Sequence, residues 1–192
     1  MITRCSWVTT DPLYIQYHDK EWGEPVHDDQ TLFEFLLLEG VQAGLSWYTI
    51  LKKRENFRHA FDQFDASKIA QYDDKKLTEL MQDKSIIRNR LKLQAIVQNA
   101  RAYLKIQNTY DSFNQYMWSF VDGQSVIHHW RHKDEVPGSS PLSDHMSKKL
   151  KMAGFSYVGT TICYSFMQAT GMIMDHTIDC FRYHELSGQI TE

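Results

Sequence analysis

A single carboxylate follows an apolar run near residue 39. The segment Leu32–Leu38 leads into Glu39, and Gln42 and Trp47 follow within nine residues. A carboxylate in apolar surroundings is costly unless it is paired or put to use, and the glycines beside it let a flat ligand come close. A carboxylate, an amide and an indole suit a pocket for a flat, nitrogen-rich ring. The alternative is a helix that ends at Gly40 with Glu39 in water.

Four metal-ligating side chains lie near the two ends of the chain. His176 and Cys180 are four residues apart, so a helix would place them on one face, and Cys5 and His18 lie near the opposite terminus. Two thiolates and two imidazoles complete a closed tetrahedral zinc site, which has no open position and is therefore structural. The alternative is a small buried cysteine and incidental histidines, because the chain has nine histidines.

A glycine-bracketed turn between two helical patterns lies near residues 150–161. Gly154 and Gly159 bracket it, and Thr160 or Thr161 suits the N-cap of the second helix. Free backbone N–H groups and the helix dipole can hold a phosphate there, and Lys151 adds positive charge. This pattern indicates a helix-hairpin-helix phosphate clamp or an ordinary packing corner. Other basic residues suit either further contacts to the DNA backbone or ordinary solvated surface. They are Lys52–Arg54, Arg88, Arg90, Lys92, Lys148 and Lys149.

Composition limits the class of protein. The chain has 192 residues, of which 42% are hydrophobic and 23% charged, as expected for one compact domain. The formal net charge of -3 gives no global basic field for nucleic acid, although local patches can serve. No stretch of eighteen apolar residues predicts a membrane span, and no signal peptide is recognisable. Three cysteines argue against a secreted disulfide scaffold, so we expect a cytoplasmic protein without membrane contact.

The apolar periodicity predicts an all-α fold. Residues 1–27 are aromatic-rich and read as irregular, and 124–142 reads as a polar, mobile loop. Asp28 or Asp29 caps a first helix through Leu37. Further helices are expected over 47–57, 65–69, 74–81, 85–106, 113–121, 144–151 and 160–171.

Several blocks, taken in order, resemble the 3-methyladenine DNA glycosylase I family. The resemblance covers residues 4–181, and His176 and Cys180 follow at the matching place. The combination of Gln42–Trp47 with Gly159–Gln168 is the most specific part of it. The blocks are Cys5–Trp7, Asp11–Ile15, Tyr17–Asp19, Glu21–Gly23, Leu38–Gly40, Gln42–Trp47, Leu51–Asn56 and Gly159–Ala169.

The resemblance implies a single all-α, helix-hairpin-helix DNA glycosylase domain over 1–192, with one structural zinc ion joining its N- and C-terminal segments. Such an enzyme flips 3-methyladenine out of double-stranded DNA and hydrolyses its N-glycosidic bond, releasing the free base and leaving an abasic site. It also implies a monomer. The implied zinc ligands are Cys5, His18, His176 and Cys180.

The resemblance also implies roles for individual side chains. Glu39 is the catalytic residue and hydrogen-bonds the purine edge, with Tyr17 as a second polar partner and Trp47 stacked on the ring. The pocket walls would be Trp7, Tyr14 and Trp22. The DNA contacts would be Leu45, as a wedge in the gap left by the flipped nucleotide, together with Gly159, Thr160 and Lys151.

Some positions depart from the family pattern or argue against other chemistry. Ser85 and Leu91 stand where glycines are expected, which affects the DNA contacts of that block, and Thr170 stands where some relatives have cysteine. Asp175 lies sixteen residues after Gly159, beside His176, and is not assigned as catalytic. No lysine occupies a nucleophile position, so we expect no lyase activity. Two alternatives remain: a zinc-stabilised, non-catalytic binder of alkylated DNA, and a zinc hydrolase acting on a small molecule.

Overall fold

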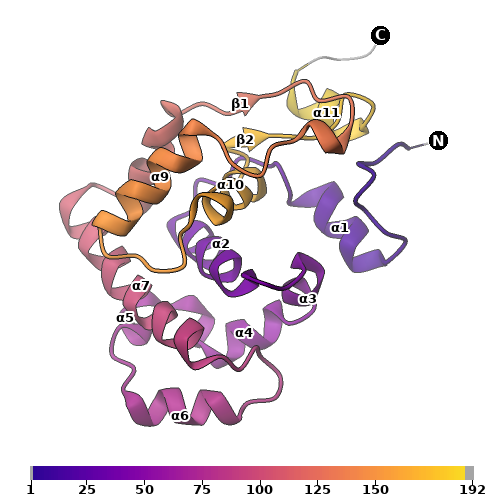
Figure 1. Cartoon of the computed structure of the whole chain (residues 1–192). Coiled ribbons are helices and arrows are strands. Elements are labelled where there is room, and N and C mark those ends of the chain that lie inside the picture. Colours follow the sequence, from indigo (N-terminus) through magenta and orange to yellow (C-terminus); the bar gives the residue numbers. More distant parts are fainter. Residues whose placement is uncertain (1, 189–192) are drawn as a thin grey trace.

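The computed structural model describes residues 2–188, so the expected 1–192 domain extends beyond the described residues at both ends. It confirms the all-α expectation, because the regular structure is almost entirely helical (Figure 1). The helices are α1 (Pro12–Lys20), α2 (Asp29–Gln42), α3 (Trp47–Leu51), α4 (Arg54–Ala60), α5 (Ala66–Ile69), α6 (Asp74–Gln82), α7 (Arg90–Thr109), α8 (Phe113–Trp118), α9 (Pro141–Met152), α10 (Thr160–Ala169) and α11 (Phe181–Leu186), with short 3-10 turns η1 (Asp62–Phe64), η2 (Ser119–Val121) and η3 (Lys133–Glu135).

Helix α2 forms the centre of the molecule (Figure 1). Asp28 caps it by accepting a hydrogen bond from the Thr31 backbone N–H, as predicted. From Leu32 onward nearly all of its own side chains are buried, which is the pattern of a helix enclosed by other helices. It packs against α3, α7, α8 and α10. This burial carries the end of α2, with Glu39, into the interior.

The N-terminal region contains a helix that we had not predicted. The Asp11 carboxylate accepts from the backbone N–H groups of Leu13 and Tyr14, and Pro12 occupies the first helical turn of α1. Asp followed by Pro is a helix-start signal, because the capping oxygen and the fixed proline φ both favour the first turn. The irregular reading of residues 1–27 was therefore wrong over α1, which positions Tyr17 and His18. Helix α11 was also missed.

Several predicted helices have different bounds, and those expected over 113–121 and 160–171 end as α-helices at Trp118 and Ala169. The helix expected over 47–57 is two helices, α3 and α4, separated at Lys52 and Lys53. The helix expected from residue 85 begins at Arg90, because the Asn89 side chain caps it by accepting from the Lys92 N–H. Residues 83–89 form a separate turn, in which the Lys53 ammonium donates to the Ser85 carbonyl.

The segment expected as a polar loop over 124–142 contains short ordered elements. Its strand β1 (Val126–Ile127) pairs in parallel with β2 (Ile173–Met174), with Val126 opposite Ile173. The 3-10 turn η3 follows, and α9 begins at Pro141, three residues before the predicted start. No helix described between residues 2 and 188 is long and apolar enough to cross a membrane.

Candidate active site and metal centre

Glu39 points into the interior from the last turn of α2. The helix continues past Gly40 to Gln42, and Glu39 is only 3% exposed, so the alternative of a solvated helix end is wrong. Gly40 allows a close approach, because a Cβ there would lie 3.2 Å from the Tyr157 carbonyl oxygen, closer than most Cβ contacts. The glycine therefore lets a later loop pack directly on α2 beside the carboxylate.

A cavity of about 330 Å³ opens beside Glu39. This volume lies at the lower end of the range for small-ligand sites, and six of its eighteen lining residues are aromatic. Tyr17 lies 5.5 Å from Trp47 between ring centroids, and Trp7 packs at 5.0 Å against Trp22. The structure thus brings together every side chain predicted for base recognition. These are Trp7, Tyr14, Tyr17, Trp22, Glu39 and Trp47, and Gln42 joins them.

The electrostatics of the cavity depend on one buried acid. Burial raises the pKa of Glu39 to about 8, because no described cation pairs with it. The Gln42 amide, with its nitrogen turned toward Glu39, donates to Oε2 at 2.7 Å and accepts from the Trp47 backbone N–H at 3.3 Å. Burial, followed by the negative charge of Glu39, raises the pKa of Tyr17 well above its usual value, so its phenol remains a donor. A cation bound beside Glu39 would favour its ionised form, and in this way the cavity favours a positively charged ligand.

Trp47 supplies a further polar group. Its ring is stacked on Phe35, with centroids 6.3 Å apart and planes 17° apart, which fixes its orientation. Its indole N–H is buried and has no hydrogen-bond partner within residues 2–188. An unpaired buried donor costs free energy that a ligand acceptor can recover.

The wall provided by α10 was not predicted from the sequence. Its lining residues recur at helical spacing and so share one face: Thr161, Tyr164, Ser165 and Gln168. This helical periodicity within the Gly159–Ala169 block could have identified these residues from the sequence. The segment after β1 adds Lys133, Val136, Pro137 and Gly138. Its glycine and prolines had indicated only a surface loop.

Asp175 holds two of these wall residues in place. Its carboxylate accepts from the Tyr164 hydroxyl at 2.6 Å, the Gln168 amide at 2.8 Å, His128 Nδ1 at 2.6 Å and the Trp130 indole N–H at 2.8 Å. A carboxylate has about four acceptor positions, and all of them are used here. The role of Asp175 is therefore to hold the wall residues in place.

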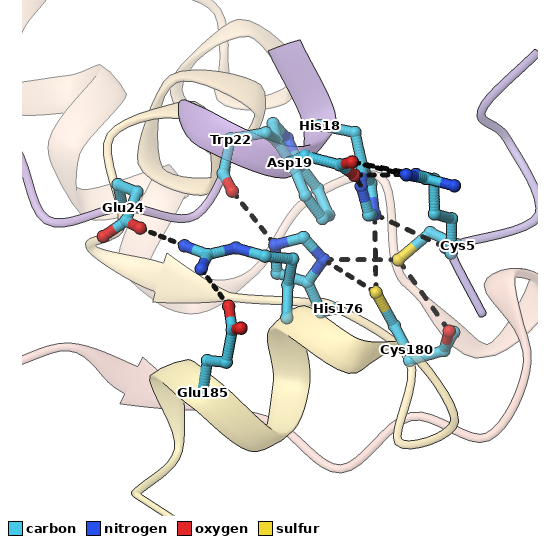
Figure 2. Close-up of polar contacts among 11 residues, drawn as sticks. Cys5, His18, Asp19, Trp22, Glu24, His176, Cys180 and Glu185 are labelled. Carbon is cyan, nitrogen blue, oxygen red and sulfur yellow. Dashed lines mark hydrogen bonds and ion pairs between the residues drawn. The ribbon is translucent and has the colours of Figure 1, made fainter. Parts of the chain in front are cut away.

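The four predicted metal ligands meet in one buried cluster (Figure 2), formed by Cys5, His18, His176 and Cys180. Their ligand atoms all lie within 4.8 Å of one another. The Cys5 sulfur is 3.4 Å from His176 Nδ1, and the Cys180 sulfur is 3.4 Å from His18 Nε2. Tetrahedral zinc with ordinary Zn–S and Zn–N bonds separates neighbouring ligand atoms by about 3.3–3.8 Å, so the spacing fits.

The second nitrogen of each imidazole is already occupied. His18 Nδ1 lies 2.7 Å from Asp19 Oδ1, and His176 Nε2 lies 2.9 Å from the Trp22 carbonyl (Figure 2). Donation to these acceptors leaves the lone pairs of the other two nitrogens facing the sulfurs, which is the tautomer that a metal requires. The hydrogen bond from Cys5 contributes most to lowering the pKa of Cys180, and the imidazoles add to it. A low thiol pKa favours the thiolate, the form that binds metals.

Comparison with known proteins places the chain in a family. The methyladenine glycosylase model matches residues 7–183. The chain belongs to the methyladenine glycosylase family. It is 52% identical to DNA-3-methyladenine glycosylase 1 of Escherichia coli (strain K12) over 180 residues, covering 94% of this chain and 96% of that protein. Its identity to the Haemophilus influenzae DNA-3-methyladenine glycosylase is 48%, covering 94% and 97%.

Solved structures of methyladenine glycosylases share this fold. A crystal structure of a 3-methyladenine DNA glycosylase I superposes with a TM-score of 0.92 at 54% identity, covering 93% of this chain and 98% of that one. A Staphylococcus aureus 3-methyladenine DNA glycosylase I, whose structure addresses recognition of 3-methyladenine, gives 0.90 at 39% identity, covering 93% and 95%.

The residues predicted to contact DNA lie on turns of this methyladenine glycosylase fold. Leu45 is 39% exposed on the turn between α2 and α3, and Lys151 is exposed in the last turn of α9. Helix α10 is capped by Gly159, with no side-chain cap bond, so Thr160 and Thr161 were not the N-cap. The Thr160 hydroxyl instead bonds to the Ser143 hydroxyl at 2.8 Å and ties α9 to α10.

Three basic residues considered for DNA backbone contacts are engaged within the protein, and a fourth, the exposed Arg90, pairs with Asp74 at the surface. Arg54 forms an ion pair with Glu21, and the Lys53 ammonium donates to a backbone carbonyl. Lys92 is only 8% exposed and also donates to backbone carbonyls. Partners distant in the sequence attract these side chains inward, so the charge pattern alone was misleading. Arg88 remains exposed.

Proposed function

We propose that this chain hydrolyses the N-glycosidic bond of 3-methyladenine in alkylated double-stranded DNA, releasing the free base and leaving an abasic site. The observation that carries the proposal is Glu39, a buried carboxylate with no cationic partner among residues 2–188, set in a cavity beside Gln42 and the aromatic ring of Trp47. Membership of the methyladenine glycosylase family and the names of the bacterial relatives support the same activity.

Recognition follows from the charge of the damaged base. 3-Methyladenine in DNA is cationic, so it can supply the counter-charge that Glu39 lacks. Cation–π attraction contributes about 0.5–2 kcal/mol per contact, and base–aromatic stacking about 1–3 kcal/mol. Flipping costs a few kcal/mol, and least for a damaged base. Because these terms are comparable, binding in the cavity offsets extrusion of the damaged base more readily than of an ordinary one.

The reaction needs little further chemistry. A water oxygen bonds to the sugar C1′ and loses one proton to solvent, while the electron pair of the broken glycosidic bond goes to the base, which becomes neutral. Glu39 and Tyr17 hold the purine edge, and Trp47 stacks on the ring. The enzyme is monofunctional. Lys133 is the lysine that lines the cavity, and it is exposed rather than desolvated, as an activated amine nucleophile would be.

One zinc ion per chain is the proposed cofactor, held by Cys5, His18, His176 and Cys180. The fit of the donor spacing and the histidine hydrogen bonds support this proposal. The ion would be structural, because four protein ligands fill a tetrahedral shell. For the same reason, a zinc hydrolase acting on a small molecule is disfavoured.

DNA binding is assigned to the helix-hairpin-helix formed by α9, the 153–159 turn and α10. Backbone N–H groups from Gly159 and Thr160 would hold a phosphate at the positive end of α10, with Lys151 adding charge. Leu45 would fill the space left by the flipped nucleotide. We propose that the protein acts as a monomer in the cytoplasm. Its DNA substrate, together with the fact that none of its three cysteines is in a disulfide, supports this compartment. Sedimentation of the protein bound to duplex DNA tests the stoichiometry.

The decisive experiment measures release of free 3-methyladenine from methylated duplex DNA by the purified protein and by Glu39→Gln. We expect release by the wild type and loss of most of it in the variant, with zinc content unchanged as the control for folding. Binding to the DNA without release of base by either protein would instead indicate a non-catalytic damage binder. Equal release by both proteins would remove Glu39 from the mechanism.

A further inference from the structure

The first turn of α7 contains a buried lysine that contacts the end of α2. The Lys92 ammonium donates to the Val41 carbonyl at 2.8 Å and to the Ala43 carbonyl at 2.5 Å. Carbonyls at a helix C-terminus lack intrahelical partners and form its negative pole, so a cation there is favourable. Burial lowers the pKa of Lys92. An ammonium is held in such a place only when its hydrogen bonds are made.

The turn attached to these carbonyls is the one that presents Leu45. Ala43 is the C-cap of α2, and Gly44 follows with a φ of +79°. The Leu45 N–H donates back to the Gln42 carbonyl at 2.6 Å. The position of Leu45 therefore depends on where the last carbonyls of α2 are held, and Lys92 holds two of them.

Seven residues further along α7, on the same face, Asn99 holds the hairpin. Its amide donates to the Ser156 carbonyl at 2.9 Å and accepts from the Ser156 N–H at 2.7 Å. Asn99 is 2% exposed, so the pair is protected from water. The next residue, Tyr157, has a φ of +54° and packs on Gly40. The hairpin is thus fixed to α7 and to α2 beside the Lys92 contact.

We infer that Lys92 and Asn99 are positioning residues for opening the DNA duplex. Because both lie on the single helix α7, they set the distance between the Leu45 turn and the 153–159 hairpin. This inference rests on the proposed glycosylase function. A wedge acts only if the phosphates are gripped at a matching distance, and a misplacement of about 1 Å can cost about 100-fold in rate. Glu39 lies a turn earlier within the regular helix, and Trp47, beyond the turn, is held by its stacking on Phe35, so we expect the base cavity to depend less on Lys92 than the Leu45 turn does.

The test compares Lys92→Met with wild type in two assays. The first is single-turnover release of 3-methyladenine from methylated duplex DNA, and the second is binding of free 3-methyladenine followed by tryptophan fluorescence. We expect release to fall about tenfold or more while the dissociation constant for the free base stays within about twofold. Lys92→Gln, which keeps an N–H donor on a shorter stem, should be intermediate. Lys105→Met, at an exposed position of the same helix, is the matched control and should behave as wild type.

Parallel loss of free-base binding in Lys92→Met would overturn the inference, because Lys92 would then support the whole pocket. Unchanged release by this variant, beside an active wild type, would overturn it as well. An inactive wild type would refute the proposed function instead, so the two failures are distinguishable.

A double-mutant cycle with Leu45→Ala tests the route of the effect. If Lys92 acts through the wedge, Lys92→Met should cost little more once Leu45 is truncated. Independent, multiplicative losses would contradict a shared route. Asn99→Ala should reduce duplex release likewise and leave free-base binding within about twofold, since Ser156 lies outside the cavity. Loss of free-base binding in this variant would overturn the role of Asn99.

Discussion

Replacing Glu39 by glutamine should stabilise the folded protein at alkaline pH while abolishing most base release. The carboxyl has an ordinary pKa of 4.5 and a folded-state pKa of about 8, raised by burial. Between these two values the folded protein retains a proton that the unfolded chain has released. Stability therefore falls by about 1.4 kcal/mol for each pH unit in that interval. The cost reaches about 3 kcal/mol at pH 7 and about 5 kcal/mol above pH 8, where it levels off.

The sign follows from the direction of the pKa change. The stabilising effect of the neutral carboxyl is complete below pH 4.5 and is lost as the pH rises through about 8. Glutamine is nearly isosteric and carries no charge, so Glu39→Gln should match wild type near pH 4.5 and exceed it by up to about 5 kcal/mol at pH 8.5.

The assay is urea unfolding of both proteins at pH 5 and pH 8.5 in the same zinc buffer. All other titrating groups are common to the pair, so the difference in free energy of unfolding isolates residue 39. A difference that does not change with pH, or a variant that is less stable at pH 8.5, would refute the reasoning. A variant that is more stable but less active is expected when a protein keeps a buried charged group for its substrate at a cost in folding stability.

Three further predictions follow from the site. Because free Glu39 must ionise, kcat/KM should rise about tenfold per pH unit up to about 8 and then level off; a flat profile between pH 6 and 9 would contradict this. Cys180→Ala should lose zinc by metal analysis and lower Tm by about 10 °C or more, since 1 kcal/mol moves Tm by about 2–4 °C at this size. Cys163→Ala, which removes a buried sulfur outside the cluster, should keep its metal, and retention of metal by Cys180→Ala would count against the assignment. Borohydride should trap no covalent adduct with abasic DNA; an adduct that disappears in Lys133→Ala would establish lyase chemistry.

Local signals in the sequence went far toward the fold and the pocket. Asp28 caps α2 as predicted, and the start of α6 at residue 74 is also as predicted, with Asp73 as its cap. The carboxylate, amide and indole around residues 39–47 do face one cavity. The spacing of His176 and Cys180 indicated a pair of ligands, but the helix expected to carry both is absent, because they lie in the irregular segment between β2 and α11. Only the resemblance indicated that Cys5 and His18 would join them. Contacts between segments at opposite ends of the chain produce no periodic pattern in the sequence.

Features that depend on distant partners could not be read from the pattern. Lys92 looks like any surface lysine, and its burial depends on carbonyls 51 and 49 residues away. Pro137 and Gly138 indicate a loop, but the parallel pairing of β1 with β2 brings that loop back toward α10 and the cavity. The Asp11–Pro12 signal for α1 is present in the sequence, but the aromatic side chains and prolines of residues 1–27 indicated only irregular structure. Those aromatic side chains in fact line the cavity.

The thiol–imidazole cluster also sets an order of events during protein synthesis. Cys5 leaves the ribosome first, and its partner His176 follows 171 residues later. Cys5, Trp22 and Thr177 belong to the wall of the base cavity as well, so the cavity closes when the cluster closes. A nascent chain therefore has no complete pocket until almost all of it has been translated, and a ribosome stalled midway releases a fragment unable to excise bases.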